Sequence, residues 1–249
     1  MRAADRDGPP IVEARGVAKR YGPLAALAGI DLSVSAGEAI VLLGPNGAGK
    51  STLLRLLATL TRPSGGRLRL FGEEALPSDA GVLRSRIGYL SHQTFLYEHL
   101  TGRENLVFYA RLYGLSDPER VAREALGAAC LSDRRDDRVG AYSRGMQQRL
   151  AIARSLLHGP EMVLLDEPFT GLDRESSARL EERLRQLRAA HRTCVMATHD
   201  LDQGLRFADR VLVLRGGRLE CDAPVRGLDS ARLEALLVTS EAVAGRGPR

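Results

Sequence analysis

The chain has 249 residues, a formal net charge of +5 and 27% charged side chains. This length suits one large α/β domain or two small ones, and the composition is that of an ordinary globular protein. Aromatic residues make up only 4%, Trp is absent and no run of Arg is long enough for a nucleic-acid arm, so we expect no nucleic-acid partner.

The three Cys residues are far apart and lack metal-ligand spacing, which suits a reducing compartment. The polar start of the sequence has no apolar core of a signal peptide, and no apolar run approaches the roughly 18 residues of a membrane helix. We therefore expect any membrane role to depend on a partner protein.

Short apolar runs in the first part of the chain predict β-strands. The run AIVLL at residues 39–43 is fully apolar, as a strand in a buried parallel sheet must be, and a Gly-rich turn follows it. A helix is expected after this turn, over residues 53–60. Further strands are predicted at residues 11–14, 30–34, 67–71 and 87–90.

The middle of the chain has a helical pattern from Thr101 to Leu157. Thr101 and Glu104 have the spacing of a capping box, in which each side chain accepts a hydrogen bond from a free N–H at the helix start. Further helices are expected to begin near Pro118 and Gly145.

Strands and helices alternate in the last third, which predicts βαβ units and a parallel sheet. An edge strand is expected at residues 218–221, a final helix at 230–237 and a disordered tail after it. The alternating elements are strands at 162–165, 193–197 and 210–214, and helices at 175–190 and 201–207.

The sequence GPNGAGKS has the pattern G-x-x-x-x-G-K-[ST] and lies between an apolar strand and a helix. Its glycines would let backbone N–H groups surround a phosphate, and the helix N-terminus would add positive charge. Lys50 would contact the β- and γ-phosphates of ATP, and the Ser51 hydroxyl would bind Mg²⁺. The residues expected to contact nucleotide here are Gly44, Pro45, Asn46, Gly47, Ala48, Gly49, Lys50, Ser51 and Thr52.

Two acids, Asp166 and Glu167, directly follow the apolar run at 162–165. A carboxylate at the end of a parallel strand beside the phosphate loop can hold Mg²⁺, directly or through water, which is the role we assign to Asp166. The adjacent Glu167 would polarise a water for in-line attack on the γ-phosphate.

Together with these motifs, two further segments make the sequence resemble the ATP-binding cassette (ABC) ATPases over residues 11–221. Residues 142–149, YSRGMQQR, resemble the signature motif of that family, and GLD at 171–173 resembles its D-loop. The resemblance implies a γ-phosphate-sensing role for His199, a catalytic and Mg²⁺-binding role for Gln93, and stacking of Tyr21 on adenine.

The resemblance also implies the fold. It indicates an α/β P-loop NTPase (RecA-like) core with an N-terminal antiparallel β subdomain and an inserted helical subdomain at about 95–157. The ATP-binding domain would cover residues 11–223, with residues 1–10 disordered before it and a short extension at 224–249.

Members of this family bind ATP between two subunits arranged head to tail, so the resemblance implies a homodimer or a pair of different cassettes. Ser143 and Gly145 would then contact the nucleotide held by the phosphate loop of the opposite subunit. The usual L-S-G-G-Q appears here as Y-S-R-G-M, with Arg144 and Met146 as departures.

The apolar and aromatic segment at 95–115 is where the family contacts its membrane permease, so we expect the chain on the cytoplasmic face of the cell membrane.

The sequences around it most resemble haem exporters of cytochrome c maturation. The alternative is a drug or antibiotic exporter, which shares the S-R-G-M sequence. A soluble ABC ATPase acting on DNA or ribosomes fits less well, because the chain has one cassette and no sustained heptads. The presence of Glu167 argues against a non-catalytic subunit.

Overall fold

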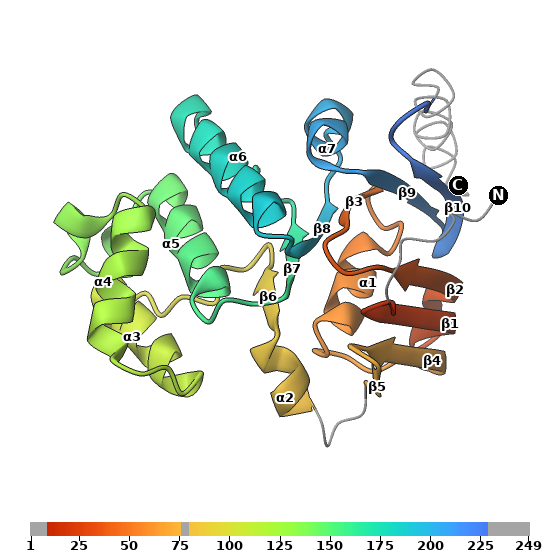
Figure 1. Cartoon of the computed structure of the whole chain (residues 1–249), viewed down its shortest axis with the longest axis horizontal. Helices are drawn as coiled ribbons and strands as arrows, with labels where there is room; N and C mark the ends of the chain where they lie inside the picture. Colours follow the sequence, from red (N-terminus) through yellow and green to blue (C-terminus); the bar gives the residue numbers. More distant parts are fainter. Residues whose placement is uncertain (1–8, 76–79, 229–249) are drawn as a thin grey trace, which may run out of the picture.

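A computed structural model describes residues 9–75 and 80–228, so the predicted helix at 230–237, the disordered tail and most of the predicted N-terminal disorder lie outside the described residues. Two β-sheets and a group of helices make up the described chain (Figure 1). None of the helices in these two ranges is long and apolar enough to cross a membrane.

The larger sheet has six strands in the order β10-β9-β3-β8-β7-β6. All neighbours are parallel except β10, which pairs antiparallel with β9. Apolar cores cover both faces of the central strands. Strands that are buried on both faces consist of continuous apolar residues, which is the pattern that predicted them. The six strands are β3 (Ala39–Leu43), β6 (Ile87–Leu90), β7 (Met162–Asp166), β8 (Thr193–Ala197), β9 (Arg210–Arg215) and β10 (Arg218–Pro224).

The smaller sheet is antiparallel, in the order β2-β1-β4-β5, which confirms the expected N-terminal β subdomain. Its first two strands are longer than predicted, because glycines, a proline and runs of small residues interrupt the strand pattern at residues 15–29. The two-residue β5 carries too little pattern to be predicted. The strands are β1 (Val12–Tyr21), β2 (Leu24–Val34), β4 (Gly65–Leu70) and β5 (Glu73–Glu74).

Helix α1 (Lys50–Leu57) lies between the two sheets, where Leu53, Leu54, Leu56 and Leu57 join a core shared by both. It begins at Lys50, three residues before the predicted start. On the other face of the six-stranded sheet, α6 (Arg174–Ala189) and α7 (Leu201–Phe207) cover a second core. The six-stranded sheet is therefore covered by α1 and the antiparallel sheet on one face and by helices on the other.

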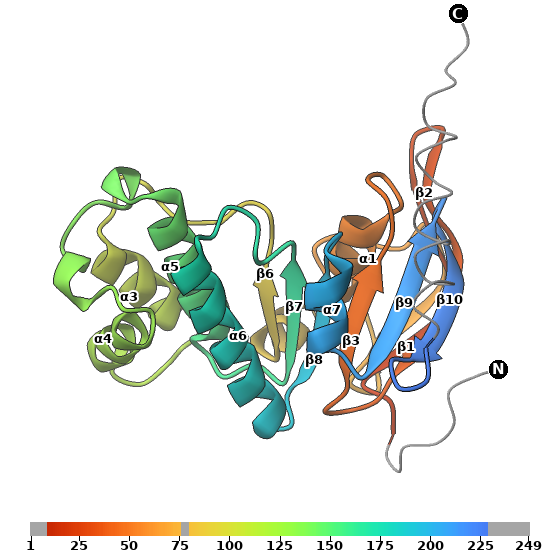
Figure 2. The same cartoon turned by 90° about the horizontal axis from the view of Figure 1, so that it is seen from above.

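The helical part forms one end of the molecule and the antiparallel sheet the other (Figure 2). Thr101 and Glu104 form the predicted capping box at the start of α3. A third apolar core holds this part together, as the inserted helical subdomain predicts. Its helices are α3 (Gly102–Leu112), α4 (Pro118–Ala128) and α5 (Arg144–Leu156). The short α2 (Ala80–Ser85), outside this group, was not predicted.

Arg210 connects the two sheets through a buried network. Its guanidinium donates to Asp222 on β10 at 2.5 and 2.6 Å, to Glu38 before β3 at 3.3 Å, and to the Ser33 carbonyl on β2 at 2.9 Å. Arg210 and Glu38 are both buried. Because an isolated buried charge is costly, these partners depend on one another.

We expect Arg210→Met to destabilise the fold by about 3–5 kcal/mol, because it leaves Glu38 buried without its cation. For a domain of this size the midpoint of thermal unfolding would fall by roughly 10 °C. The control is Arg120→Met, which removes an exposed ion pair with Glu124 and should change little. Equal unfolding temperatures for Arg210→Met and the wild type by calorimetry would contradict this role.

Candidate functional site

The phosphate loop between β3 and α1 can close only because of its glycines. A Cβ on Gly44 would lie 2.1 Å from the Leu214 carbonyl oxygen, and one on Gly49 would lie 2.5 Å from the Ala26 oxygen. Both have positive φ, as does Gly47, which has open space where a side chain would be. The loop is thus anchored at both ends and exposes its middle, as a backbone cradle for a phosphate requires.

Lys50 is the first residue of α1 and is only 7% exposed. Its ammonium donates to the carbonyls of Gly44 at 2.6 Å and Pro45 at 3.2 Å, within its own loop. Burial lowers the Lys50 pKa, and the charges of Glu167 and Asp166 oppose that shift. The ammonium therefore lies in a poorly hydrated place, where an anion would stabilise it.

Sheet register brings the phosphate loop and Asp166 to the same edge. Leu42 on β3 and Asp166 on β7 are both paired with Ala197 on the intervening strand β8. The Ser51 hydroxyl accordingly reaches Asp166 and donates to its Oδ1 at 3.1 Å. The structure thus brings together two of the three residues that the sequence assigned to Mg²⁺, and Gln93 is the third.

Asp166 is 4% exposed, and burial raises its pKa, although the Ser51 hydrogen bond and the Lys50 charge act in the opposite direction. A hydroxyl and a carboxylate are hard oxygen ligands of the kind that Mg²⁺ prefers, with water and substrate phosphates completing its shell. The described residues contain no group of three or more His, Cys, Asp or Glu that could hold a metal without such help. The pair therefore fits a metal delivered with a nucleotide.

Glu167 is held beside His199. The Glu167 backbone has φ of 51°, and its N–H donates to the Ala197 carbonyl at 2.9 Å. This turn directs the carboxylate to His199, whose Nδ1 lies 2.9 Å from Glu167 Oε2. Glu167 is largely shielded and His199 is mostly exposed. A carboxylate next to the phosphate loop and hydrogen-bonded to an imidazole can orient and deprotonate an attacking water.

A cavity of about 370 Å³ adjoins these acids. It is lined by Asp166 and Glu167, by the start of α5 including Arg144, and by His92 and Thr94 from the loop after β6. Gln93 lies on the same loop, exposed and with its backbone N–H bonded to Ser91, but it does not line the cavity. The roles assigned to Gln93 stay a prediction, and His92 is a neighbour that the sequence alone did not single out.

The remaining predicted contacts lie on other elements. Tyr21 ends β1 with an exposed ring, on the hairpin whose residue Ala26 contacts the phosphate loop. Ser143 is the N-cap of α5, and its Oγ accepts from the Met146 N–H at 3.3 Å. Ser143 is exposed and neither it nor Gly145 lines the cavity beside Asp166. Their nucleotide contacts therefore stay predictions.

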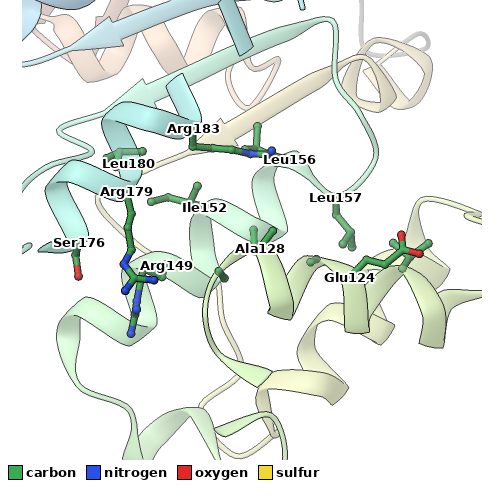
Figure 3. Close-up of a pocket in the computed structure, with 14 residues that line it drawn as sticks. Glu124, Ala128, Arg149, Ile152, Leu156, Leu157, Ser176, Arg179, Leu180 and Arg183 are labelled. Carbon is green, nitrogen blue, oxygen red and sulfur yellow. The ribbon is translucent and has the colours of Figure 1, made fainter. Parts of the chain in front are cut away.

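A second cavity, of about 310 Å³, lies between α4, α5 and α6 (Figure 3). Apolar side chains such as Ile152 and Leu180 form much of its wall, and Arg149 and Arg179 border it (Figure 3). None of the predicted nucleotide or metal residues lines it. The residues with chemistry for phosphate thus gather at the sheet edge and not in this cavity.

We predict that Asp166→Asn stabilises the nucleotide-free protein at neutral pH while lowering Mg²⁺-dependent ATP turnover by about 10–100-fold or more. A carboxyl whose pKa is raised by folding binds its proton more tightly when folded, so stability falls as the pH rises through that range. The neutral amide of Asn avoids this loss of stability. The gain in stability of Asp166→Asn over the wild type should therefore shrink as the solution is acidified toward the ordinary Asp pKa.

Calorimetry at neutral and acidic pH would measure the difference. Asp173→Asn is the matched control, because the Ser176 N–H lowers the pKa of that carboxyl and its replacement should give no such gain. An Asp166→Asn protein that is less stable than the wild type at neutral pH would contradict the assigned burial cost.

Comparison with known proteins agrees with this geometry. The family description "ABC transporter" matches residues 27–170. The Nod factor export ATP-binding protein I of Burkholderia lata is 39% identical over 83% of this chain and 68% of its own length. The daunorubicin/doxorubicin resistance ATP-binding protein DrrA of Streptomyces peucetius is 41% identical over 88% of this chain and 67% of its own length.

Among solved structures, a dimeric post-hydrolysis state of the ATP-binding cassette MJ0796 bound to ADP and Pi superposes with a TM-score of 0.81. It is 28% identical and covers 87% of this chain and all of its own. The fold, the phosphate loop and the paired acids agree with this family. The chain therefore belongs to the ABC transporter family, as an enzyme that hydrolyses ATP.

Proposed function

We propose that this chain is the ATP-hydrolysing subunit of an exporter that moves an organic compound of the drug or antibiotic kind across a membrane. The observation that carries the ATP-driven part is the arrangement of Lys50, Ser51, Asp166, Glu167 and His199 at one sheet edge. In it, Lys50 and the glycine loop hold the terminal phosphates and Glu167 activates water. Bound Mg²⁺ would neutralise charge on the β- and γ-phosphates.

The working unit in this proposal is a head-to-tail dimer. Ser143 lies at the exposed N-terminus of a 13-residue helix, where an N–H group and the helix dipole favour an anion. The ATP-binding cassette MJ0796, to which this chain is similar, has been solved as a dimer. Nucleotide between two copies would use Ser143 and Gly145 of one and the phosphate loop of the other.

The permease would dock on an aromatic surface formed by Phe95, Tyr97 and Phe108. All three rings are exposed, and Tyr97 and Phe108 pack edge to face with centroids 5.2 Å apart. Exposed clustered aromatics are typical of protein-binding surfaces. A permease helix seated there would hold the chain at the cytoplasmic face of the membrane.

The nature of the cargo rests on the relatives. Those reported above are named for Nod factor export and for daunorubicin/doxorubicin resistance, and neither name refers to haem. They favour the alternative of a drug or antibiotic exporter over the haem exporter that the linker sequences suggested. The residues at the sheet edge have chemistry for phosphate and Mg²⁺, so in this proposal the permease selects the cargo.

Substituting Glu167→Gln should lower ATP turnover by about 10²–10⁴-fold, because the amide cannot accept the proton of the attacking water. ATP would then remain bound, and the protein should elute as a dimer when light scattering is measured with saturating ATP. Lys50→Ala, which loses the phosphate contact, is the control and should stay monomeric. A strictly monomeric Glu167→Gln protein would count against the dimer, and unchanged turnover would count against the role of Glu167.

The two cargo assignments predict opposite phenotypes for a strain that lacks this chain. We expect slower efflux of the fluorescent drug doxorubicin, restored by the wild-type gene but not by Glu167→Gln, and normal amounts of c-type cytochromes. Loss of c-type cytochromes with normal drug efflux would instead support haem export.

A further inference from the structure

Arg144 packs against the backbone of Gly171, in a contact that the family's usual glycine could not make. A Cβ built on Gly171 would lie 2.5 Å from Arg144 Nε and 2.9 Å from its Cζ. Gly171 also has φ of +78°. Gly171 thus has a backbone conformation that favours glycine, and the Arg144 guanidinium occupies the space where a side chain at 171 would begin.

A second side chain of α5 reaches the same segment. Gln148 lies one turn after Arg144, on the same face of the helix, and its Nε2 donates to the Pro168 carbonyl at 2.9 Å. Both contacts fall within residues 167–173, which we name the 167–173 segment. Two adjacent turns of α5 thus hold this segment from one side.

The 167–173 segment has a functional group at each end. It begins with Glu167, which contacts His199, and ends with Asp173, which caps α6 by accepting from the Ser176 N–H at 2.7 Å. Inside it, the Thr170 N–H donates to the Glu167 carbonyl at 3.2 Å. The segment is therefore a compact turn, so a shift of its middle would be passed to Glu167.

We propose that Arg144 is a positioning residue that, with Gln148, links the signature segment to the 167–173 segment of its own chain and thereby couples the two nucleotide sites of a dimer. The proposal rests on the head-to-tail dimer described above. In that dimer Ser143 faces the nucleotide of the partner subunit, whereas Glu167 serves the nucleotide of its own chain. Movement of α5 on nucleotide binding at one site is transmitted through Arg144 to Glu167 at the other.

The chemistry of arginine suits this link. Its planar guanidinium can pack on a peptide backbone, whereas a lysine ammonium is a compact point charge and glycine offers no side chain. Arg144 also lines the cavity that Asp166 and Glu167 line. Comparing Arg144→Gly with Arg144→Lys separates the packing contact from the charge.

Hydrogen exchange on the nucleotide-free protein tests the link without relying on catalysis. We expect several-fold faster exchange of the 167–173 segment in Arg144→Gly, partial protection in Arg144→Lys and unchanged exchange in the phosphate loop. Arg174→Gly is the control, because Arg174 is also the first residue of a helix, is exposed and makes no hydrogen bond or ion pair with a described residue. Equal exchange of the segment in wild type and Arg144→Gly overturns the link.

The dependence of hydrolysis rate on ATP concentration tests the coupling. The wild type should show a Hill coefficient above that of independent sites, and Arg144→Gly should fall to about 1 with a lower kcat. ATP affinity in the absence of hydrolysis should stay the same, since the phosphate loop is intact. A non-cooperative wild type, or cooperativity that Arg144→Gly leaves unchanged, overturns the coupling. A wild type that stays monomeric with ATP contradicts the proposed dimer, while the exchange result still decides the link itself.

Discussion

Two opposite charges buried at one sheet edge are the constraint on which the rest of the structure depends. Lys50 and Asp166 are both removed from water, and burial disfavours the charged form of each. They gain partial compensation from loop carbonyls and from the Ser51 hydroxyl. A fold selected for stability alone would replace them with apolar residues, so their presence points to a role in binding, which agrees with the ATP site of this family.

The surrounding architecture holds these charges in register. The strands β3 and β7 meet β8 at the same residue, Ala197, which fixes where the phosphate loop and Asp166 end. Helix α1 is clamped between two sheets by its leucines, so Lys50 and Ser51 at its start cannot move independently of the core. The positive φ of Glu167 then directs its own carboxylate toward His199. The packing that stabilises the core therefore also aligns the residues of the site.

The sequence was sufficient to predict those parts of the fold and the site that depend on a local motif. The glycine loop, the buried strands and the pair Asp166 and Glu167 each combine a spacing rule with a hydrophobic run, and the structure brings them together as expected. The lengths of β1 and β2 were underestimated because their residues alternate weakly. The six-residue α2 was missed because it is too short to show a periodicity.

Contacts between distant segments were beyond sequence reasoning. Arg144 was recognised as a departure from the family pattern, but its packing on Gly171 depends on how α5 meets the loop after β7. The presence of His92, rather than Gln93, at the cavity depends on one turn after β6. The cargo was also beyond sequence reasoning: the resemblance of linker sequences favoured haem, whereas the relatives are named for Nod factor export and for daunorubicin/doxorubicin resistance.

The most direct measurement is the thermal unfolding of wild type and Lys50→Ala with and without a non-hydrolysable ATP analogue and Mg²⁺. Ligand at about 100 times its Kd should stabilise the wild type by about 2.7 kcal/mol, because it binds only the folded state. That corresponds to a rise of several degrees in the unfolding midpoint, which Mg²⁺ alone should not produce. Lys50→Ala should show almost none of it. An equal rise in both proteins would contradict the claim that the buried charges form the nucleotide site.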